Sequence, residues 1–151
     1  MKNKNLLITG AATRVGKAIA LHFAERGWNI ALHYFRSSSK AKKLKKIIEQ
    51  NWVKVALIKA DLKNPKQTEK IIPLARKKLG TIDCLVNSAA LFEKDDITNF
   101  TTKSWNDHLN INLRAPTILT KQFAKQASKK TVSNIINIID QRIFKLTPFF
   151  M

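Results

Sequence analysis

The sequence is short of several residue types, and each shortage excludes a class of protein. Cys84 is the single cysteine, so no internal disulfide is possible and a reducing compartment, the cytoplasm, is expected. No apolar run approaches the roughly 20 residues that cross a bilayer. The run Leu6–Ala12 is too short for a signal peptide and leads into a patterned segment, so neither a targeting segment nor a membrane span is expected.

Acidic residues are scarce as well. Ten Asp and Glu stand against 28 Lys and Arg, which leaves a net charge of +18 over 151 residues. Such a field favours anionic partners, namely nucleotides, nucleic acid or an anionic membrane surface. The densest basic cluster, Lys40–Lys46, falls on a predicted helix, where a solvated lysine face is the expected role. Without an aromatic-interleaved basic surface or a known reading motif, nucleic acid is not the expected partner.

Short apolar runs alternate with segments of helical period, without an internal repeat. The pattern predicts strands at Asn5–Thr9, Asn29–Tyr34, Val53–Ala60, Ile82–Asn87 and Ser133–Ile139, and helices at Val15–Arg26, Lys40–Asn51, Lys66–Leu79 and Lys103–Lys130. Pro73 is expected to kink or split the third helix, and Pro116 to interrupt or restart the fourth. Strict alternation predicts an α/β fold, a Rossmann-like doubly wound parallel sheet of five strands with flanking helices, in one domain over residues 1–151.

The turn Thr9–Gly16 joins the first predicted strand to the first predicted helix. Its unpaired N–H groups and the positive end of the helix dipole would form a phosphate cradle, although an ordinary turn with two glycines looks similar. Gly10, Tyr34, Asp61 and Asn87 end four successive strands. Ligands of doubly wound sheets bind where the carboxyl ends of the strands meet, so these positions predict a nucleotide site.

The stretch after the second predicted strand indicates which nucleotide. NAD-binding sheets place a carboxylate there, whereas His33–Ser38 contains none. Arg36 and the neighbouring serines suit a 2′-phosphate, and Arg14 lies within reach of the same group. A surface arginine and a helix-capping serine are the plainer alternatives for Arg36 and Ser37. The pattern predicts NADP(H) rather than NAD(H).

The turn Thr9–Gly16 and the stretch Leu32–Ser37 resemble the short-chain dehydrogenase/reductase family, specifically its pteridine-reductase-like branch. Four further segments match the same family: Ala60–Leu62, Leu85–Ala90, Asn110–Pro116 and Ile135–Asp140. The matches run in family order over essentially the whole chain. The resemblance implies that the cofactor phosphates are held by Gly10, Arg14, Val15 and Gly16, and the 2′-phosphate by His33, Tyr34, Arg36 and Ser37. The adenine and its ribose would meet Asp61, Leu62, Asn87, Ser88 and Ala89, with Ser88 in place of a commoner asparagine.

The resemblance also implies roles around the substrate, and no metal ion. Phe92 would stack on a pterin ring beside Arg14, although a core phenylalanine is an equal alternative. Asn112 matches the asparagine that orders a proton-relay water. Asp140 falls where most of the family has its catalytic serine and where the pteridine-reductase-like branch has aspartate; read alone, it is a turn or cap residue.

The family's proton donor is a tyrosine followed four residues later by a lysine, and this pair is absent. The only tyrosine is Tyr34, and the pair would lie just beyond Met151. The sequence thus predicts a truncated oxidoreductase, inactive alone or completed by a second polypeptide or a homo-oligomer; a non-catalytic NADP(H)-binding module is the alternative. The isoleucines of Ser133–Ile139 would then be poorly covered on an edge strand, and Phe144, Phe149 and Phe150 would contact something outside the chain.

Overall fold

A parallel sheet of five strands forms the centre of the structure. The computed structural model describes residues 3–127 and 132–140. Its strands are β1 (Asn5–Ile8), β2 (Asn29–Tyr34), β3 (Val55–Lys59), β4 (Cys84–Asn87) and β5 (Asn134–Asn137), in the order β3-β2-β1-β4-β5. Every neighbouring pair is parallel. The strand order reverses at β1, so the predicted doubly wound, Rossmann-like sheet is confirmed.

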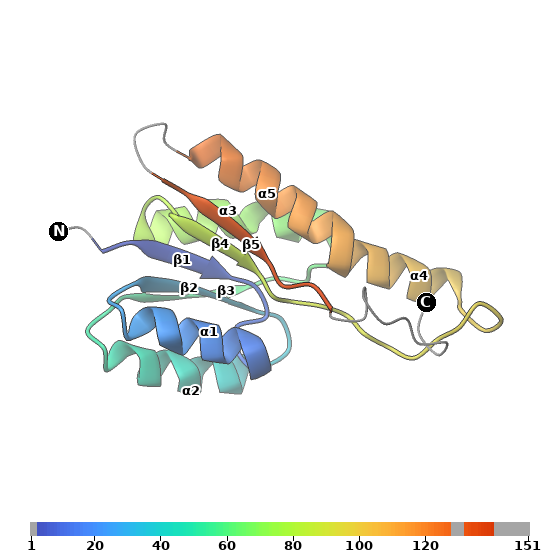
Figure 1. Cartoon of the computed structure of the whole chain (residues 1–151), viewed down its shortest axis with the longest axis horizontal. Helices are drawn as coiled ribbons and strands as arrows, with labels where there is room; N and C mark the ends of the chain where they lie inside the picture. The colour runs from blue at the N-terminus through green and yellow to red at the C-terminus, as the bar shows by residue number, and fades with distance from the viewer. Residues whose placement is uncertain (1–2, 128–131, 141–151) are drawn as a thin grey trace.

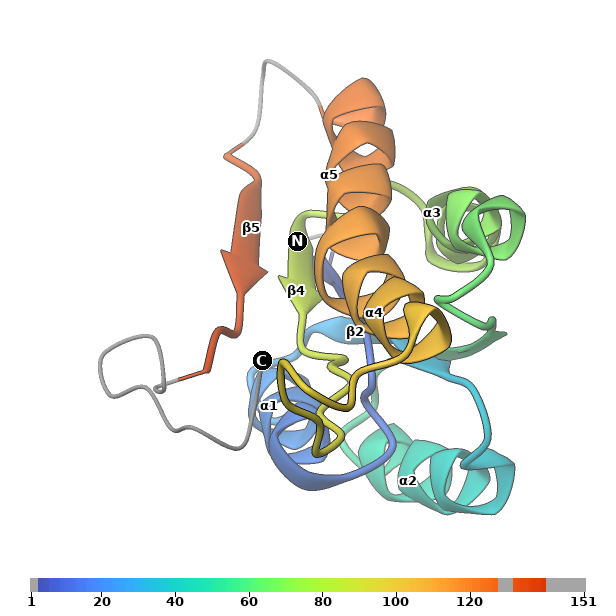
Figure 2. The same cartoon turned by 90° about the vertical axis from the view of Figure 1, so that its right-hand side faces the viewer.

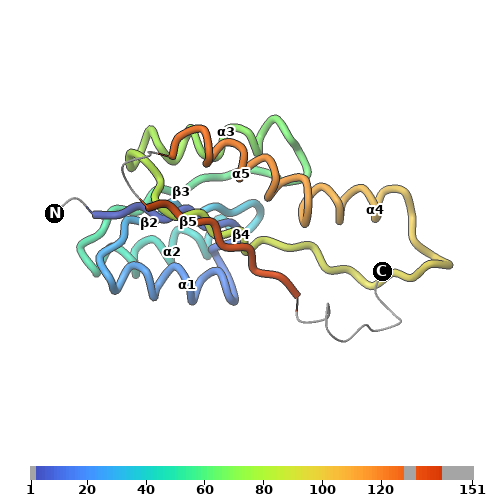
Figure 3. Tube along the Cα trace, turned by 45° about the horizontal axis from the view of Figure 1, so that its top comes forward, coloured from blue at the N-terminus to red at the C-terminus, as the bar shows by residue number. Residues whose placement is uncertain are grey.

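Helices cover both faces of the sheet. They are α1 (Arg14–Ala24), α2 (Ser38–Glu49), α3 (Pro65–Leu79), α4 (Thr102–Leu109), the π-helical turn η1 (Asn110–Arg114) and α5 (Ala115–Gln126). Helices α1 and α2 lie on one face and α3 and α5 on the other, while α4 and η1 continue the line of α5 past the sheet (Figures 1 and 3). Apart from the end of the last helix, element ends lie within two residues of their predicted positions. None of the described helices is long and apolar enough to cross a membrane.

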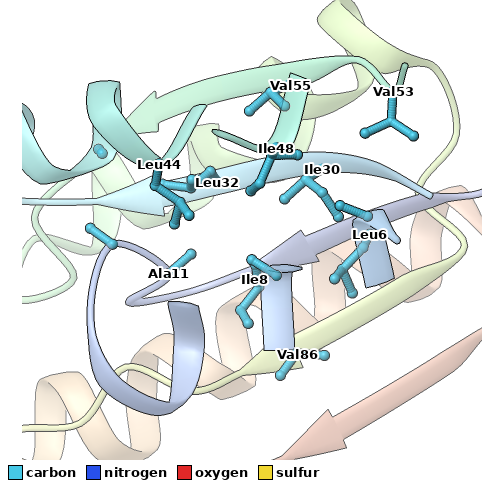
Figure 4. Close-up of a cluster of buried hydrophobic side chains, with 14 of the residues drawn as sticks. Leu6, Ile8, Ala11, Ile30, Leu32, Leu44, Ile48, Val53, Val55 and Val86 are labelled. Carbon is cyan, nitrogen blue, oxygen red and sulfur yellow. The ribbon is translucent and has the colours of Figure 1, made fainter. Parts of the chain in front are cut away.

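The core consists of two apolar clusters, one on each face of the sheet. Leu6 and Ile8 point toward α1 and α2, where they meet Leu44 and Ile48 of α2 (Figure 4). Leu7, between them in the chain, packs on the opposite face with residues of α3 and α5. All three strand residues are fully buried, as expected for a central parallel strand. This anchoring fixes the position from which the loop after β1 departs.

Two prolines test the predicted helix breaks. Helix α3 runs through Pro73 as one helix, so the expected split is wrong. Pro73 is exposed, whereas Ile71, Ile72 and Ala75 are buried, and this packing holds the helix together across the missing hydrogen bond. Pro116 lies in the first turn of α5, directly after η1. The expected restart there is confirmed, since proline suits a first helical turn and π-turns accommodate a local break.

Strand β5 forms an edge of the sheet beside β4 (Figure 2). Its isoleucines are 37–41% exposed at Ile135 and Ile136, and Ile138 and Ile139 beyond it are 44% and 68% exposed. By contrast, no residue of the central strand β1 is more than 1% exposed. The predicted poor coverage of these isoleucines is therefore confirmed. Phe144, Phe149 and Phe150 lie outside the described residues, as does the end of the predicted helix at 128–130.

Candidate functional site

Hydrogen bonds join the loop after β1 to the end of β2 and to the loop after β4 at one rim of the sheet. The Ala11 N–H donates to the His33 carbonyl at 3.0 Å. The Thr9 hydroxyl oxygen accepts from the N–H groups of both Ser88 and Ala89, each at 3.0 Å. The rim predicted from the strand ends therefore exists, and Thr9, which the sequence did not single out, holds two of its loops together.

Both glycines of the loop are required by close backbone contacts. Gly10 has φ +65°, and a Cβ there would lie 2.9 Å from the Ala89 Cα. A Cβ on Gly16 would lie 2.5 Å from the Gly10 carbonyl oxygen. Separations under about 3 Å between such atoms are not tolerated, so any side chain would force the loop, α1 and β4 apart.

Arg14 adopts an unusual backbone conformation at the first position of α1. Its φ is +49°, in the left-handed region that favours glycine. Residues held this way cost about 1–3 kcal/mol and cluster at functional sites. Glycine would adopt this conformation without strain, so the backbone itself does not account for an arginine at this position.

A cavity of about 940 Å³ opens over the glycine loop and the groove between α1 and α2. Eight of the predicted site residues line it: Gly10, Arg14, Val15, Gly16, Ser37, Ser88, Ala89 and Phe92. The cavity wall also carries three lysines, Lys17, Lys40 and Lys43. The described lining residues include no carboxylate, so the cavity is a cationic site.

Helices α1 and α2 begin at this cavity, and the positive charge at their amino ends is not offset by a capping side chain or an acidic residue. Thr13 and Ser37 are the N-caps of α1 and α2, and neither side chain makes a capping hydrogen bond. Neither helix has an acidic residue in its first turn. The positive ends of both dipoles therefore add to the cationic side chains, an arrangement that suits phosphate groups.

His33 does not face this cavity. It is 2% exposed; its Nε2 contacts the Ala60 carbonyl at 3.1 Å, and its Nδ1 accepts from the Gly10 N–H at 3.3 Å. The expectation that His33 surrounds a 2′-phosphate is wrong, because both ring nitrogens are used inside the protein. Burial lowers the pKa of His33 to about 4, against the smaller opposing effects of the Ala60 bond and the Asp61 charge. The neutral ring instead ties β2 and β3 to the glycine loop.

The other residues predicted for the adenine end of the cofactor differ in their burial and contacts. Leu62 is 7% exposed and belongs to a core cluster. Its predicted contact with an adenine stays a prediction, which its backbone would have to make. Asp61 Oδ1 accepts from the Lys63 N–H at 3.0 Å within a turn. Tyr34 packs against the core on the α1–α2 face. Arg36 is exposed, with its guanidinium 5.3 Å from the centre of the Phe35 ring.

Asn87 carries a buried acceptor that the protein does not satisfy. Its Nδ2 donates to Asn137 Oδ1 at 2.8 Å, which links the carboxyl ends of β4 and β5. Its own Oδ1 is buried and has no hydrogen-bond partner within residues 3–127 and 132–140. A buried, unpaired carbonyl is costly, so this oxygen is an acceptor that a ligand hydroxyl could satisfy, although Asn87 is not among the described residues that line the cavity.

The predicted substrate and catalytic residues are not all brought together. Phe92 lines the cavity with 52% of its surface exposed, so it is not a core phenylalanine. Asn112, in η1, accepts from the Leu91 N–H and donates to the Leu91 carbonyl, both at 2.8 Å. It therefore positions the loop after β4. Asp140 is exposed shortly after β5 and is not among the described residues that line the cavity.

A polar network that the sequence analysis missed fastens the loop after β4 to α4. The Ser104 hydroxyl donates to Asp95, and His108 Nδ1 lies 2.9 Å from the Ser104 carbonyl. His108 Nε2 accepts from the Glu93 N–H at 3.3 Å. Both imidazole nitrogens are thereby engaged with backbone, so the cluster holds the loop rather than activating the serine.

The comparison with known families decides the assignment. The family described as short chain dehydrogenase has a model that matches residues 4–145. The chain belongs to the short-chain dehydrogenase family. Among curated members, the Staphylococcus epidermidis 3-oxoacyl-[acyl-carrier-protein] reductase FabG is 28% identical over 136 residues, which are 90% of this chain and 56% of the relative. This short-chain dehydrogenase chain thus spans little more than half the length of the curated relatives it matches.

Solved structures of the same family superpose closely. FolM alternative dihydrofolate reductase 1 from Brucella canis, in complex with NADP, is 31% identical with a TM-score of 0.93, over 99% of this chain and 61% of that one. A blue fluorescent protein from a metagenomic library, in complex with NADPH, is 28% identical with a TM-score of 0.88, over 94% of this chain and 57% of that one. The short-chain dehydrogenase fold therefore extends over the whole described chain.

Proposed function

We propose that this chain binds NADP(H) at the cationic cavity over the glycine loop, as a single domain formed by residues 1–151. The observation that carries the proposal is the set of groups around that cavity: two uncapped helix amino ends, Arg14 and three lysines, with no carboxylate among the described lining residues. The cofactor also fits the orphaned Asn87 Oδ1, since a ribose hydroxyl supplies the missing donor. The NADP- and NADPH-bound relatives add support.

The proposed reaction class is reduction of a dihydropteridine or dihydrofolate. Support comes from the 31% identity to the Brucella alternative dihydrofolate reductase and from Asp140 at the position where the pteridine-reductase-like branch has aspartate. The exposed ring of Phe92 in the cavity suits stacking on a planar heterocycle. The FabG relatives, at 28% identity, make reduction of a 3-oxoacyl thioester the competing outcome of an activity test.

Each residue has a proposed part in that function. When bound, NADPH supplies a hydride. Gly10 and Gly16 keep the backbone of the cradle open to the phosphates, Val15 lines the same cavity, and Arg14 neutralises the phosphates. Ser88 and Ala89 keep the loop after β4 against the cofactor site through their bonds to Thr9. Asn112 holds that loop at Leu91, and Asp140 is the proposed polar group on the substrate side.

We propose further that the proton donor comes from outside these 151 residues. The only tyrosine, Tyr34, follows α1 and packs against the core on the α1–α2 face, and no Tyr-x-x-x-Lys segment is present. The half-exposed isoleucines of β5 are consistent with a second polypeptide or another copy completing the sheet. A cytoplasmic location stays a prediction from the single cysteine.

Cofactor binding and turnover test the proposal separately. NADPH and NADH titrations should show a preference for NADPH of at least about tenfold, as a charge-assisted phosphate site provides, and Arg36→Ala should remove most of it. Equal affinity for the two dinucleotides would contradict the NADP(H) assignment. The purified chain should not oxidise NADPH with dihydropteridine, dihydrofolate or a 3-oxoacyl thioester. Measurable hydride transfer by this chain alone would show that the donor lies within it.

A further inference from the structure

We propose that Lys40 and Lys43 of α2 form part of the 2′-phosphate subsite and help to select NADP(H) over NAD(H). This inference rests on the proposed NADP(H) function and deepens it. The sequence predicts one solvated lysine face over Lys40–Lys46. The structure divides that cluster instead, because Lys40 and Lys43 line the cavity with Arg14 and Ser37, whereas Lys42, Lys45 and Lys46 are not among its described lining residues.

The rotation of α2 is fixed by its core contacts. Successive residues of a helix lie about 100° apart, so Lys40, Lys43, Leu44 and Ile47 share one side. Leu44 is 2% exposed and packs into the core cluster that contains Ala11 and Leu32 (Figure 4). Leu44 also lines the cavity. Because this buried leucine is the boundary between core and cavity, the two lysines next to it on the helix surface are turned to the ligand side.

The other lysines of the cluster have different surroundings. Lys45 pairs with Glu49 at 3.5 Å, an ordinary i,i+4 surface contact. Lys42 and Lys46 are exposed on the sides of α2 away from Lys40. One helix thus carries cavity lysines and outer lysines with the same side chain and the same charge, and the latter form a matched control.

The charges across the cavity determine which anion fits. Ser37, at the amino end of α2, has a hydroxyl that does not cap its helix, and Arg14 faces the cavity from α1. A phosphomonoester carries close to two negative charges and three acceptor oxygens, so it uses more than one cation and a hydroxyl donor. The glycine loop would hold the pyrophosphate, so the α2 lysines would be left to the phosphate that distinguishes the two dinucleotides.

The probes are 2′,5′-ADP (adenosine 2′,5′-bisphosphate) and 5′-AMP, which differ only by the 2′-phosphate. The double variant Lys40→Gln/Lys43→Gln should weaken binding of 2′,5′-ADP about tenfold at fixed ionic strength, with less than about a twofold change for 5′-AMP. The control Lys42→Gln/Lys46→Gln, with the same change of net charge, should alter both affinities by less than about twofold. Lys40→Arg/Lys43→Arg should retain binding of 2′,5′-ADP, and thermal unfolding of each variant checks its fold.

Three results would overturn the inference. Equal losses in the cavity and control doubles would mean that only the overall charge matters. Equal losses for the two probes would place the lysines at the 5′-phosphate or the ribose, which both probes share. A cavity double that binds 2′,5′-ADP like the wild type would remove the lysines from the site, while the NADP(H) function stands. If the wild type binds neither NADPH nor 2′,5′-ADP, the proposed function fails and the lysine subsite fails with it.

Discussion

The Nδ1 of His33 and the backbone N–H of Gly10 are joined by a 3.3 Å hydrogen bond across two strands of the sheet. The ring is 2% exposed, and its Nε2 is hydrogen-bonded to the Ala60 carbonyl at 3.1 Å. The Nδ1 that accepts from Gly10 must be unprotonated, so the proton resides on Nε2. A neutral imidazole is therefore a structural part of the glycine loop.

This bond predicts acid sensitivity. Burial lowers the pKa of His33 from 6.5 to about 4, so below pH 6.5 the unfolded chain binds a proton that the folded chain does not. The stabilisation is fully present above pH 6.5 and is lost as pH falls toward 4, by about 3 kcal/mol in total at 1.36 kcal/mol per pKa unit. Urea unfolding from pH 4 to 8 should show this slope in the wild type and not in His33→Gln.

His22→Gln is the matched control, because His22 is exposed whereas His33 is buried. It should keep the wild-type slope between pH 4 and 6.5. Because the charge of Asp61 also acts on His33, the quantity compared is the difference in slope between the wild type and each variant. An unchanged slope in His33→Gln would show that other groups cause the acid sensitivity.

Gly16→Ala should damage both stability and cofactor binding. The new Cβ would lie 2.5 Å from the Gly10 carbonyl oxygen, so the loop must move away from α1. We expect a loss of about 1–3 kcal/mol in unfolding free energy, as for other overpacked sites, together with loss of NADPH binding. Gly27→Ala is the control: its Cβ meets nothing within 4 Å, although its φ of +77° strains any side chain. It should lower stability by about 1 kcal/mol and leave NADPH affinity unchanged.

Arg14→Gly should separate stability from function. Glycine relieves the left-handed backbone at φ +49°, which offsets its greater unfolded-state entropy, so stability should stay level or rise by up to about 1 kcal/mol. NADPH affinity should nevertheless fall about tenfold or more, because a cation is removed from the phosphate site. Trp52→Gly relieves a similar φ of +58° at a residue that is 95% exposed and should leave NADPH affinity unchanged. Calorimetry and fluorescence titration on both variants decide the matter; unchanged NADPH affinity in Arg14→Gly would contradict the assigned role.

The fold and the rim of the site were predictable from the sequence because they depend only on the order of strands and helices along the chain. Once strands and helices alternate, the strands run parallel and their carboxyl ends meet, so Gly10 and Asn87 must lie at one edge. The close contacts of Gly10 and Gly16 follow from the same geometry. None of this required knowing the direction of any side chain.

Side-chain direction is where the sequence was insufficient. Five of the six residues of β2 are buried, so period-two alternation could not tell that His33 turns inward. Leu62 lies just after a strand, and its side chain packs into a core cluster. The local sequence pattern did not indicate this direction either. The lysines of α2 occupy every side of the helix except the buried side formed by Ala41, Leu44 and Ile48. Only the docking of Leu44 decides which of them reach the cavity. Such facts depend on tertiary packing rather than on local pattern.

Asn112 and Leu91 provide the last test. The Asn112 amide both accepts from and donates to the Leu91 backbone at 2.8 Å, which pins the loop after β4 to η1. Asn112→Ala leaves both backbone groups without this partner, at a cost of about 1–3 kcal/mol where they stay dry. Hydrogen exchange of the Leu91 amide should accelerate strongly, and NADPH affinity should fall as Phe92 loses its fixed position. Asn110→Ala, which removes only a 2.6 Å bond to Arg114, should leave Leu91 exchange unchanged. Equal acceleration in both variants would mean that η1 as a whole, rather than the Asn112 amide, holds the loop.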